Sequence, residues 1–280
     1  MSLTNKIDLA VVFKVKNANP NGDPLNGNRP RTNYDRIGEI SDVCIKRKIR
    51  NRLMEIKEGE KYKYNIFVQS DDNKLDGCKN LRERAETVID SQKSSKENAD
   101  SACKKWFDVR AFGQVFAYSG DKKGSGVSIG VRGPVSIHTA FSLSPVEITS
   151  TQITKSVSGE GDGKKKGSDT MGMKHRVDEG VYVFVGSMNP QLATKTGFND
   201  EDALAIKNIL PKLFENDASS ARPEGSMEVL KVIWWQHNCP HGQYSSAKVH
   251  RSLSVNSDAS LDSEKLDSLD GLTPELIDGF

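Results

Sequence analysis

The sequence has few of the residues that mark secreted or membrane-spanning proteins. It holds four cysteines among 280 residues, none in a Cys-x-x-Cys pair, which excludes a disulfide framework and predicts reduced thiols. No run approaches the roughly 18 consecutive apolar residues of a membrane span, and the N-terminus lacks the apolar segment of a signal peptide. We therefore expect a cytoplasmic protein.

Apolar residues are also scarce: hydrophobic content is 35%, aromatic content is 7%, and mean hydropathy is −0.58. Such a composition predicts long exposed loops, or surfaces that become buried only in an assembly. Length alone allows one elaborated domain or two small ones, and we expect one domain with insertions.

Motifs of common enzyme classes are missing. The chain has no Gly-x-Ser-x-Gly, no His-Glu-x-x-His and no P-loop, since its glycine-rich stretch at residues 159–163 lacks the Gly-Lys-Ser/Thr ending. His237, Cys239 and His241 alternate along an extended segment, but a structural zinc site takes four ligands and no second ligand pair is evident. We expect no metal, no cofactor and no catalytic residues.

Charge is unevenly distributed, although the formal net charge is only +2. Residues 256–280 carry seven acids and one lysine, a net −6, so residues 1–255 carry +8. Residues 29–52 hold eight bases against three acids, and such a basic patch attracts a polyanion. The acidic tail is expected to be a solvated or partner-contacting appendage outside the polyanion surface.

Residues 41–56 have the pattern of an amphipathic helix with a basic side. Ser41 is a favourable N-cap, and Asp42 suits the positive end of the helix dipole. The apolar stripe is formed by Ile45, Ile49, Leu53 and Ile56, and the neighbouring cationic face by Lys46, Arg47 and Arg50. A purely solvated basic face is the alternative interpretation of these three cations.

The segment before this helix is a shaped loop. An apolar stretch at residues 7–15 predicts a strand, and residues 19–31 follow with the sequence Asn-Pro-Asn-Gly-Asp-Pro-Leu-Asn-Gly-Asn-Arg-Pro-Arg. Its glycines and prolines indicate defined turns that present Asn, Asp and Arg side chains. Strand, loop and basic helix together are typical of phosphate binding.

These two motifs resemble the RNA-binding backbone subunit of type I CRISPR interference complexes (Cascade), most closely the type I-C version. That family has an Asn-Pro-Asn-Gly-Asp-Pro loop followed by a helix that begins Thr/Ser-Asp-Val-Cys-x-Lys-Arg-Lys-x-Arg. Both parts are intact here, at residues 19–24 and 41–50. The resemblance implies binding of guide RNA (crRNA), a homo-oligomer along that RNA, pairing of the guide with target DNA, and association with the large, small and crRNA-processing subunits of Cascade.

Residues 57–113 contain weaker signals. Residues 62–69 predict a second strand, residues 80–92 are compatible with a helix, and residues 91–101 are a loose polar tract. In the resembling family this position holds a helical finger-like subdomain. The stretch at residues 106–113, Trp-Phe-Asp-Val-Arg-Ala-Phe-Gly, is compatible with a core element in which Asp108 pairs with Arg110, and equally with a role in RNA binding. It also resembles the family's Asp-x-Arg-x-Phe-Gly element.

The region of residues 127–141 predicts β-structure interrupted by Gly130, Gly133 and Pro134. Glycines inside a strand mark a bend or the close approach of another backbone. The Gly-Pro-Val-Ser-Ile segment resembles the family's Gly-Pro-Val strand beside the guide RNA, and Arg132 directly before it is a candidate phosphate ligand.

Residues 148–177 predict a long hairpin or loop with a glycine-rich tip. An ordinary surface loop is the alternative. The resemblance makes it the thumb, a hairpin that reaches over the neighbouring subunit and lifts one nucleotide out of the guide–target duplex. Met171 and Met173 are then the candidate base wedges.

Strands at residues 181–188 and 227–235, with a capped helix at residues 199–216, complete the element order β, α, β, β, β, α, β. We expect an α+β fold: a modified ferredoxin-like, RRM-like palm with a helical finger insertion and a thumb hairpin insertion. The expected segments are the palm (residues 1–70, 106–147 and 178–255), the finger (71–105), the thumb (148–177) and the acidic tail (256–280).

The sequence therefore predicts a non-enzymatic RNA-binding scaffold. The candidate RNA contacts are Asn19, Asn21, Arg31, Lys46, Arg47, Arg50, Arg132, Lys164, Lys165 and Arg176. Two alternatives stay open. A metal-dependent ribonuclease could use Asp23 or Asp42, because related type III backbone subunits cut RNA with one early-loop Asp, although a lone carboxylate is weak evidence. A generic single-strand RNA-binding protein is the other.

Overall fold

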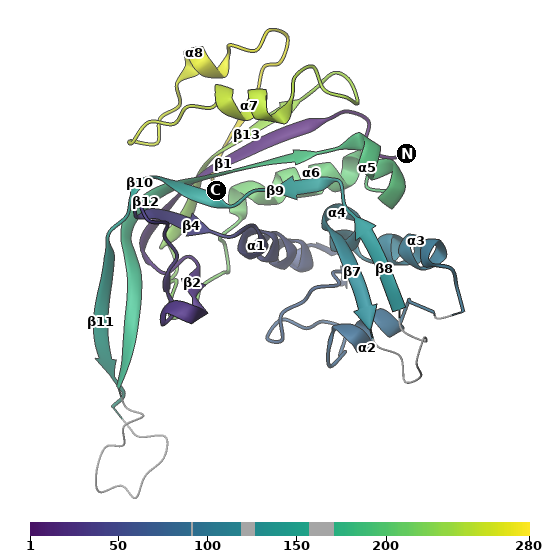
Figure 1. Ribbon diagram of the computed structural model, residues 1–280, viewed down its shortest axis with the longest axis horizontal. Coiled ribbons are helices and arrows are strands. Elements are labelled where there is room, and N and C mark those ends of the chain that lie inside the picture. The colour runs from purple at the N-terminus through teal and green to yellow at the C-terminus, as the bar shows by residue number, and fades with distance from the viewer. Residues whose placement is uncertain (91, 119–126, 157–170) are drawn as a thin grey trace, which may run out of the picture.

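A central antiparallel sheet organises the computed structural model, which describes all residues except 91, 119–126 and 157–170. Among the described residues eight strands belong to it: β1 (Ile7–Ala18), β4 (Ile37–Ile40), β9 (Val135–Ile137), β10 (Ala140–Pro145), β11 (Ile148–Thr154), β12 (Met171–Met188), β13 (Met227–Gln236) and β14 (Glu275–Asp278). The main strand order is β14-β13-β1-β12-β10-β4, with β9 and β11 also paired to β12 (Figure 1). The mixed helix-and-strand fold is confirmed.

Strand β1 is the middle of this sheet because it pairs with β12 on one side and β13 on the other. Leu9, Val11 and Phe13 enter the core under one face, whereas Ala10 and Val12 enter a second core under the opposite face. Because a strand that is covered on both faces buries every side chain, its sequence is an uninterrupted run of apolar residues. The strands predicted at residues 7–15, 181–188 and 227–235 are confirmed, and each extends beyond its predicted bounds.

Helices α1 (Asp42–Glu55), α5 (Pro190–Thr196) and α6 (Asp200–Ile209), with the 3-10 turn η3 (Leu210–Lys212), contribute to the larger core. The Oγ of Ser41 caps α1 by accepting from the backbone N–H of Cys44. Asn199 and Asp202 form a capping box at the start of α6. Both predicted helices exist, but the second ends as an α-helix at Ile209 rather than at residue 216.

Residues 237–272 cover the other face of the sheet with α7 (Ser246–Ser252) and α8 (Ser263–Leu266), and the chain then joins the edge of the sheet as β14. Leu266, Leu269 and Leu272 are buried against Trp235 and Val249. The acidic C-terminal segment is therefore not a solvated appendage. Its acids stay at the surface while its leucines, spaced three apart, enter the core.

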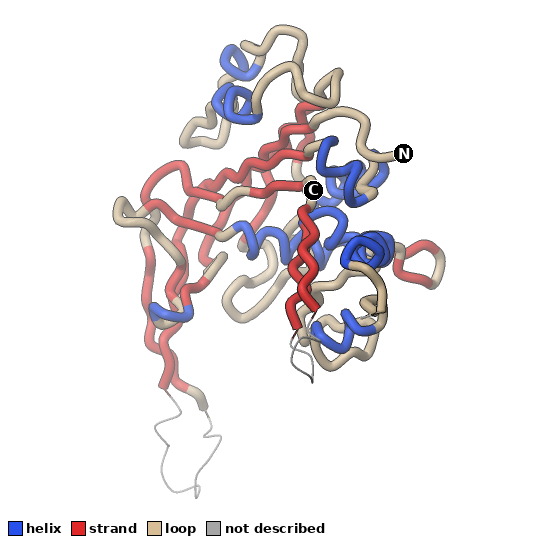
Figure 2. The backbone as a smooth tube through the Cα atoms, turned by 45° about the vertical axis from the view of Figure 1, so that its right-hand side comes forward, coloured by secondary structure: helices blue, strands red, loops and turns tan. Residues whose placement is uncertain are grey.

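A second, smaller body lies beside α1 and has its own hydrophobic core. It contains α2 (Leu81–Glu86), α3 (Ser95–Lys105), α4 (Phe107–Phe112), and a separate hairpin of β7 (Gly113–Tyr118) and β8 (Val127–Arg132), visible in Figure 2. Phe67, Trp106, Phe116 and Ile129 line its core, which extends on both sides of residues 71–105.

Two predictions in this region are wrong. The strand predicted at residues 62–69 is absent from the described chain, which has only the short β5 (Lys57–Glu58) and β6 (Lys61–Tyr62) there. The backbone N–H groups of Phe67 and Val68 instead donate to the carboxylate of Asp108, at 2.6 and 3.0 Å. The tract predicted as loose at residues 91–101 contains the first two turns of α3, because Ser94 and Glu97 form a capping box.

Strand β11 and the first half of β12 form a two-stranded arm that projects from the sheet (Figures 1 and 2). The predicted hairpin at residues 148–177 is confirmed for its described residues, and its glycine-rich tip lies outside them. The loop at residues 19–31 contains β2 (Gly22–Asp23), the 3-10 turn η1 (Pro24–Asn26) and β3 (Arg29–Pro30). Within the described ranges, no helix combines the length and apolar character needed to cross a membrane.

Candidate nucleic-acid interface

The loop at residues 19–31 is attached to the N-terminus of α1. The Oδ1 atom of Asn21 accepts from the backbone N–H of Ser41 at 2.9 Å and from its hydroxyl at 3.0 Å. Asn19 is buried, and its Nδ2 donates to the carbonyl of Asn28 at 2.7 Å. The two asparagines predicted as RNA contacts therefore shape this loop and hold it against the helix.

The cations of α1 are partly neutralised by carboxylates. The Nζ of Lys46 donates to the Asp42 carboxylate at 2.8 Å. Partial burial of Asp42 raises the pKa of its carboxyl group, but the hydrogen bond from Lys46 and its charge outweigh that effect, so the pKa is lowered. Arg47 approaches Asp217 at 3.8 Å and keeps 39% of its side chain exposed, against 21% for Lys46 and 11% for Arg50. The predicted basic face is thus half-buried, and Arg47 is its most accessible member.

Arg50 joins α1 to the smaller body. Its Nε donates at 2.8 Å to Asp108, which is buried and also accepts the two backbone N–H groups of residues 67 and 68. The predicted Asp108–Arg110 pair is wrong: Arg110 makes two bonds to Asp202 of α6, at 2.8 and 2.7 Å. Replacement of Arg50 would leave a buried carboxylate without its cation.

Phe112 is the phenylalanine of the Asp-x-Arg-x-Phe-Gly element, and although it is not among the predicted RNA contacts, it lies where several of them meet. Its ring centroid is 6.0 Å from the Nζ of Lys46 and 5.2 Å from the Cζ of Arg50. The next residue, Gly113, is paired in register with Arg132. Lys46 and Arg50 of α1 and the backbone of Arg132 are therefore grouped around one aromatic side chain.

Close backbone packing holds that group together. A Cβ atom on Gly133 would lie 2.4 Å from the carbonyl oxygen of Ala111 and 2.4 Å from the nitrogen of Gly113. The predicted close approach is confirmed at Gly133, whereas Gly130 has nothing within 4 Å of such an atom. Only glycine at position 133 allows the end of β8 to approach the backbone of residues 111–113 this closely.

The arm presents a separate set of predicted residues. Met171 and Met173 are 66% and 54% exposed and lie on the same face of β12, two residues apart. Arg176 is exposed and lies 3.5 Å from the Asp178 carboxylate. Lys164 and Lys165 lie outside the described residues.

Asp217 is the hub of an ion-pair cluster behind α1. It pairs with Lys48, whose side chain is fully buried, with Arg222 at 3.0 Å, and more distantly with Arg47. Burial lowers the pKa of Lys48, and the Asp217 charge opposes that effect. No local sequence signal connects Asp217 with Lys48, which lies 169 positions earlier.

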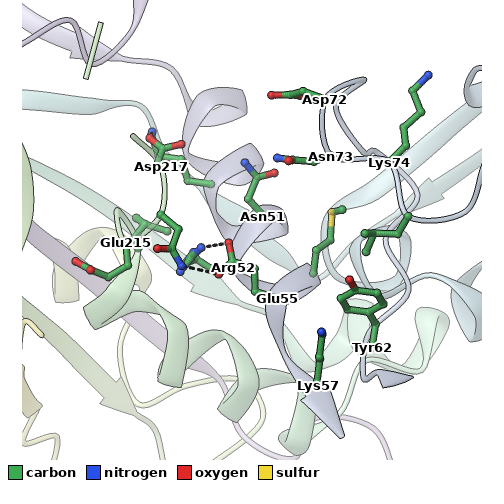
Figure 3. A pocket seen from close by; sticks show the side chains of 15 residues that line it. Asn51, Arg52, Glu55, Lys57, Tyr62, Asp72, Asn73, Lys74, Glu215 and Asp217 are labelled. Carbon is green, nitrogen blue, oxygen red and sulfur yellow. Dashed lines mark hydrogen bonds and ion pairs between the residues drawn. The ribbon is translucent and has the colours of Figure 1, made fainter. Parts of the chain in front are cut away.

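The C-terminal half of α1 also borders a cavity of about 460 Å³ (Figure 3). Its walls come from α1, the β5–β6 hairpin, residues 72–75 and residues 213–217. Arg52 bonds Glu55 across one wall, and Asn216 donates to Glu55 at 3.2 Å. None of the predicted RNA contacts lines this cavity, and its lining includes the ion pairs Lys48–Asp217 and Arg52–Glu55.

The carboxylates considered for metal-dependent chemistry are occupied by cations or caps. Asp23 accepts from the backbone N–H of Leu25 and lies 3.4 Å from Arg31, while Asp42 bonds Lys46. In the part of the chain that the structure describes, no cluster of three or more His, Cys, Asp or Glu residues is placed to hold a metal ion. His237 instead bonds the buried Asp8 at 2.9 Å. All four cysteines are free.

Comparison with known proteins adds a family match. Residues 5–272 match the model of a family described as CRISPR-associated protein Cas7. The chain is similar to the CRISPR-associated protein Cas7 of Haloferax volcanii, with 24% identity over 275 residues that cover 93% of this chain and 78% of the relative.

Two solved chains are more distantly similar. One, from a CRISPR RNA-guided surveillance complex described as pre-nicking, is 14% identical with a TM-score of 0.49, covering 82% of this chain and 75% of that one. Another, from a CRISPR RNA-guided surveillance complex, is 16% identical with a TM-score of 0.43, covering 82% and 68%.

Proposed function

Because the chain belongs to the Cas7 family of CRISPR-associated proteins, we propose that it binds crRNA and oligomerises along it as the helical backbone of a type I-C Cascade complex. In this role it presents the spacer for pairing with target DNA in antiviral defence. It works as a scaffold without catalysis, and its partners are further copies of itself and the large, small and crRNA-processing subunits.

The observation that carries this proposal is the grouping of accessible cations along one path. Lys46 of α1 lies over the ring of Phe112 of α4, and Arg132 of β8 pairs in register with Gly113, the residue after Phe112. Arg47 follows Lys46 along α1, on the side that faces Asp217. The loop at residues 19–31 adds Arg29 and Arg31 at the N-terminus of α1, to which Asn21 fixes it. Cations and an aromatic ring in one place suit a single strand with phosphates and unstacked bases.

Binding of this kind is independent of sequence. Lysine and arginine recognise phosphate groups, which are the same for every spacer, and an RNA backbone subunit must accept any spacer. The carboxylates beside these cations hold their side chains in place before RNA arrives. RNA phosphate then competes with Asp42 for Lys46. Binding is sensitive to salt because each phosphate contact releases counterions from the RNA.

The fold fits the proposed architecture. Strands β13-β1-β12-β10, with α1 between β1 and β10 and α6 between β12 and β13, follow the order of a ferredoxin-like, RRM-like palm. The smaller body corresponds to the finger and the arm to the thumb. Met171 and Met173 on the arm are the base wedges, and apolar wedges of this kind offset the unstacking of a base step.

The test compares two alanine pairs. Lys46→Ala with Arg47→Ala removes two cations without orphaning a buried charge, because Asp217 keeps Lys48 and Arg222. Lys104→Ala with Lys105→Ala, an exposed adjacent pair in the last turn of α3, is the matched control. We expect about tenfold weaker binding of single-stranded RNA for the first pair and a salt slope lower by about 1.4, or 0.7 per phosphate contact.

Equal slopes and affinities for the two pairs would show that the basic side of α1 is only a solvated surface. A second measurement addresses the guide itself. Protein purified without added RNA carries RNA of defined length, detected on a gel after phenol extraction and abolished by ribonuclease. RNA of random length would favour a generic single-strand RNA-binding protein.

A further inference from the structure

The turn between β3 and β4 exposes an aromatic ring completely. Thr32 and Gly38 form an isolated bridge, and the turn at its end carries Tyr34, whose relative exposure of 108% means that no other residue covers it. A tyrosine of this kind gives nothing to the core. Exposed aromatic side chains on a well-defined turn are typical of recognition surfaces.

The turn is held by a dense set of hydrogen bonds. The Oδ1 atom of Asn33 accepts from the backbone N–H groups of Asp35 and Ile37, both at 2.9 Å. The backbone N–H of Arg36 donates to the Asn33 carbonyl at 3.1 Å, and that of Asn33 donates to the Ile37 carbonyl at 3.0 Å. Tyr34 is therefore presented from a fixed backbone, so a ligand that contacts it need not order the turn.

Arg36 occupies a left-handed conformation that favours glycine. Its φ is +61°, the position that follows a type I turn in a three-residue hairpin loop. An arginine in this conformation strains the backbone, which indicates that its side chain has a structural or binding role that glycine could not fill. Its guanidinium bonds Glu147 at 2.9 Å with two thirds of the side chain exposed, and its carbonyl accepts from the backbone N–H of Val146. Arg36 thereby fastens the turn to the base of the arm.

The same turn is continuous with the loop that meets α1. The backbone N–H of Glu39 donates to the Arg31 carbonyl at 2.9 Å, and that of Arg31 donates to the Asn21 carbonyl at 3.2 Å. Tyr34 thus lies between the two elements to which the proposed function assigns RNA, the loop at residues 19–31 and the arm. Arg29, on the neighbouring β3, is exposed and forms no ion pair within the described ranges.

We infer that Tyr34 is a stacking platform for one unpaired nucleobase of the bound RNA, with Arg36 and Arg29 placed to contact the adjoining phosphates. This inference rests on the proposed function. Nucleobases stack on tyrosine irrespective of their identity, because every base has a π face, and this suits a surface that must accept any sequence. The exposed arginines on this turn and on the neighbouring β3 favour a polyanion over an apolar protein segment.

The experiment uses three substitutions and one control in the full-length protein. Tyr34→Ala and Tyr34→Leu remove the ring, Tyr34→Trp keeps an aromatic face, and Tyr62→Ala removes a 45% exposed tyrosine that lies 5.2 Å from Lys57 in the β5–β6 hairpin. Because Tyr34 makes no packing contact, all three substitutions at this position leave folding intact, as circular dichroism would verify.

The probe is a single-stranded RNA that contains 4-thiouridine. We expect Ala and Leu to weaken its binding about tenfold, Trp and the Tyr62 control to bind as wild type, and the salt slope to stay unchanged because no charge is removed. Long-wavelength ultraviolet light crosslinks the thiouridine to Tyr34 in the wild-type protein, and mass spectrometry locates the adduct.

Three outcomes would overturn the inference. In the first, Tyr34→Ala binds RNA with wild-type affinity while Lys46→Ala with Arg47→Ala binds it weakly. Tyr34 would then not contact RNA, and the proposed function would stand. Retention of affinity by Leu as well as Trp points to an apolar contact instead of stacking. If neither the Tyr34 nor the α1 variants change RNA binding, the proposed function itself fails.

Discussion

Asp217→Asn should test how α1 is held in place. The substitution keeps the shape of the side chain but removes the anion that faces the buried Lys48, as well as Arg222 and Arg47. Lys48 has no route to solvent, since its side-chain exposure is zero, so the variant must either keep an uncompensated ammonium in the core or neutralise it.

Removal of one partner from a buried ion pair costs about 3–5 kcal/mol. We expect the lower end, about 3 kcal/mol, because Asp217 keeps 12% of its side chain exposed and the asparagine oxygen still accepts a hydrogen bond. For a chain of this size, that loss corresponds to a fall in Tm of about 6–12 °C.

The effect should depend on pH with a defined sign. Burial holds the pKa of Lys48 below its ordinary value of 10.5, so unfolding takes up a proton between the two values and stability rises with pH there. Asp217→Asn lowers the folded-state pKa further. Its deficit relative to wild type is therefore largest near neutral pH and shrinks as the pH rises toward 10.5.

Thermal and urea unfolding, followed by circular dichroism at several pH values, measure these quantities. The double variant Lys48→Met with Asp217→Asn is the control, since it replaces both charges and should recover most of the stability lost by Asp217→Asn. The reasoning is refuted if Asp217→Asn unfolds like wild type, or if the double variant is no more stable than the single one.

Three further predictions concern the site. Gly133→Ala should destabilise by about 2–4 kcal/mol and impair RNA binding, because its Cβ meets backbone atoms at 2.4 Å, whereas Gly130→Ala should be close to neutral; equal denaturation midpoints would contradict this. The protein with guide should not cut complementary RNA or DNA with Mg²⁺ or Mn²⁺; metal-dependent cutting that Asp23→Ala abolishes would establish the nuclease instead. Met171→Ser with Met173→Ser should leave stability unchanged, since both side chains are exposed, but erase evenly spaced hyper-reactive nucleotides from chemical probing of the guide; an unchanged pattern would place the wedge elsewhere.

Local interactions made part of the fold predictable from sequence. The start of α1 follows from Ser41 and Asp42, whose roles involve only the next turn, and β1 follows from a run of apolar residues. The start of α3 could also have been predicted, because Ser94 and Glu97 have the spacing of a capping box. The polar composition around them led instead to the prediction of a loose tract. Bonds that span three or four residues need no knowledge of the rest of the chain.

Charge partners were decided by the tertiary structure alone. The sequence places Asp108 two residues from Arg110, yet Asp108 bonds Arg50, 58 positions away, and Arg110 bonds Asp202, 92 positions away. The same carboxylate accepts the N–H groups of Phe67 and Val68, which is why the expected strand there has no partner strand. Long-range Coulomb and hydrogen-bond partners depend on which backbone segments meet, and that depends on packing of the whole chain.

The sequence by itself determined the basic helix, the shaped loop before it and the family resemblance, since these are properties of contiguous residues. Only the tertiary structure decided which cations remain accessible, because Lys48 and Arg50 carry the same charge as Arg47 but point into carboxylates at the core. It also brought Phe112 beside α1 and fixed Tyr34 at the base of the arm. Burial, not residue type, separates a structural cation from one that can reach a phosphate.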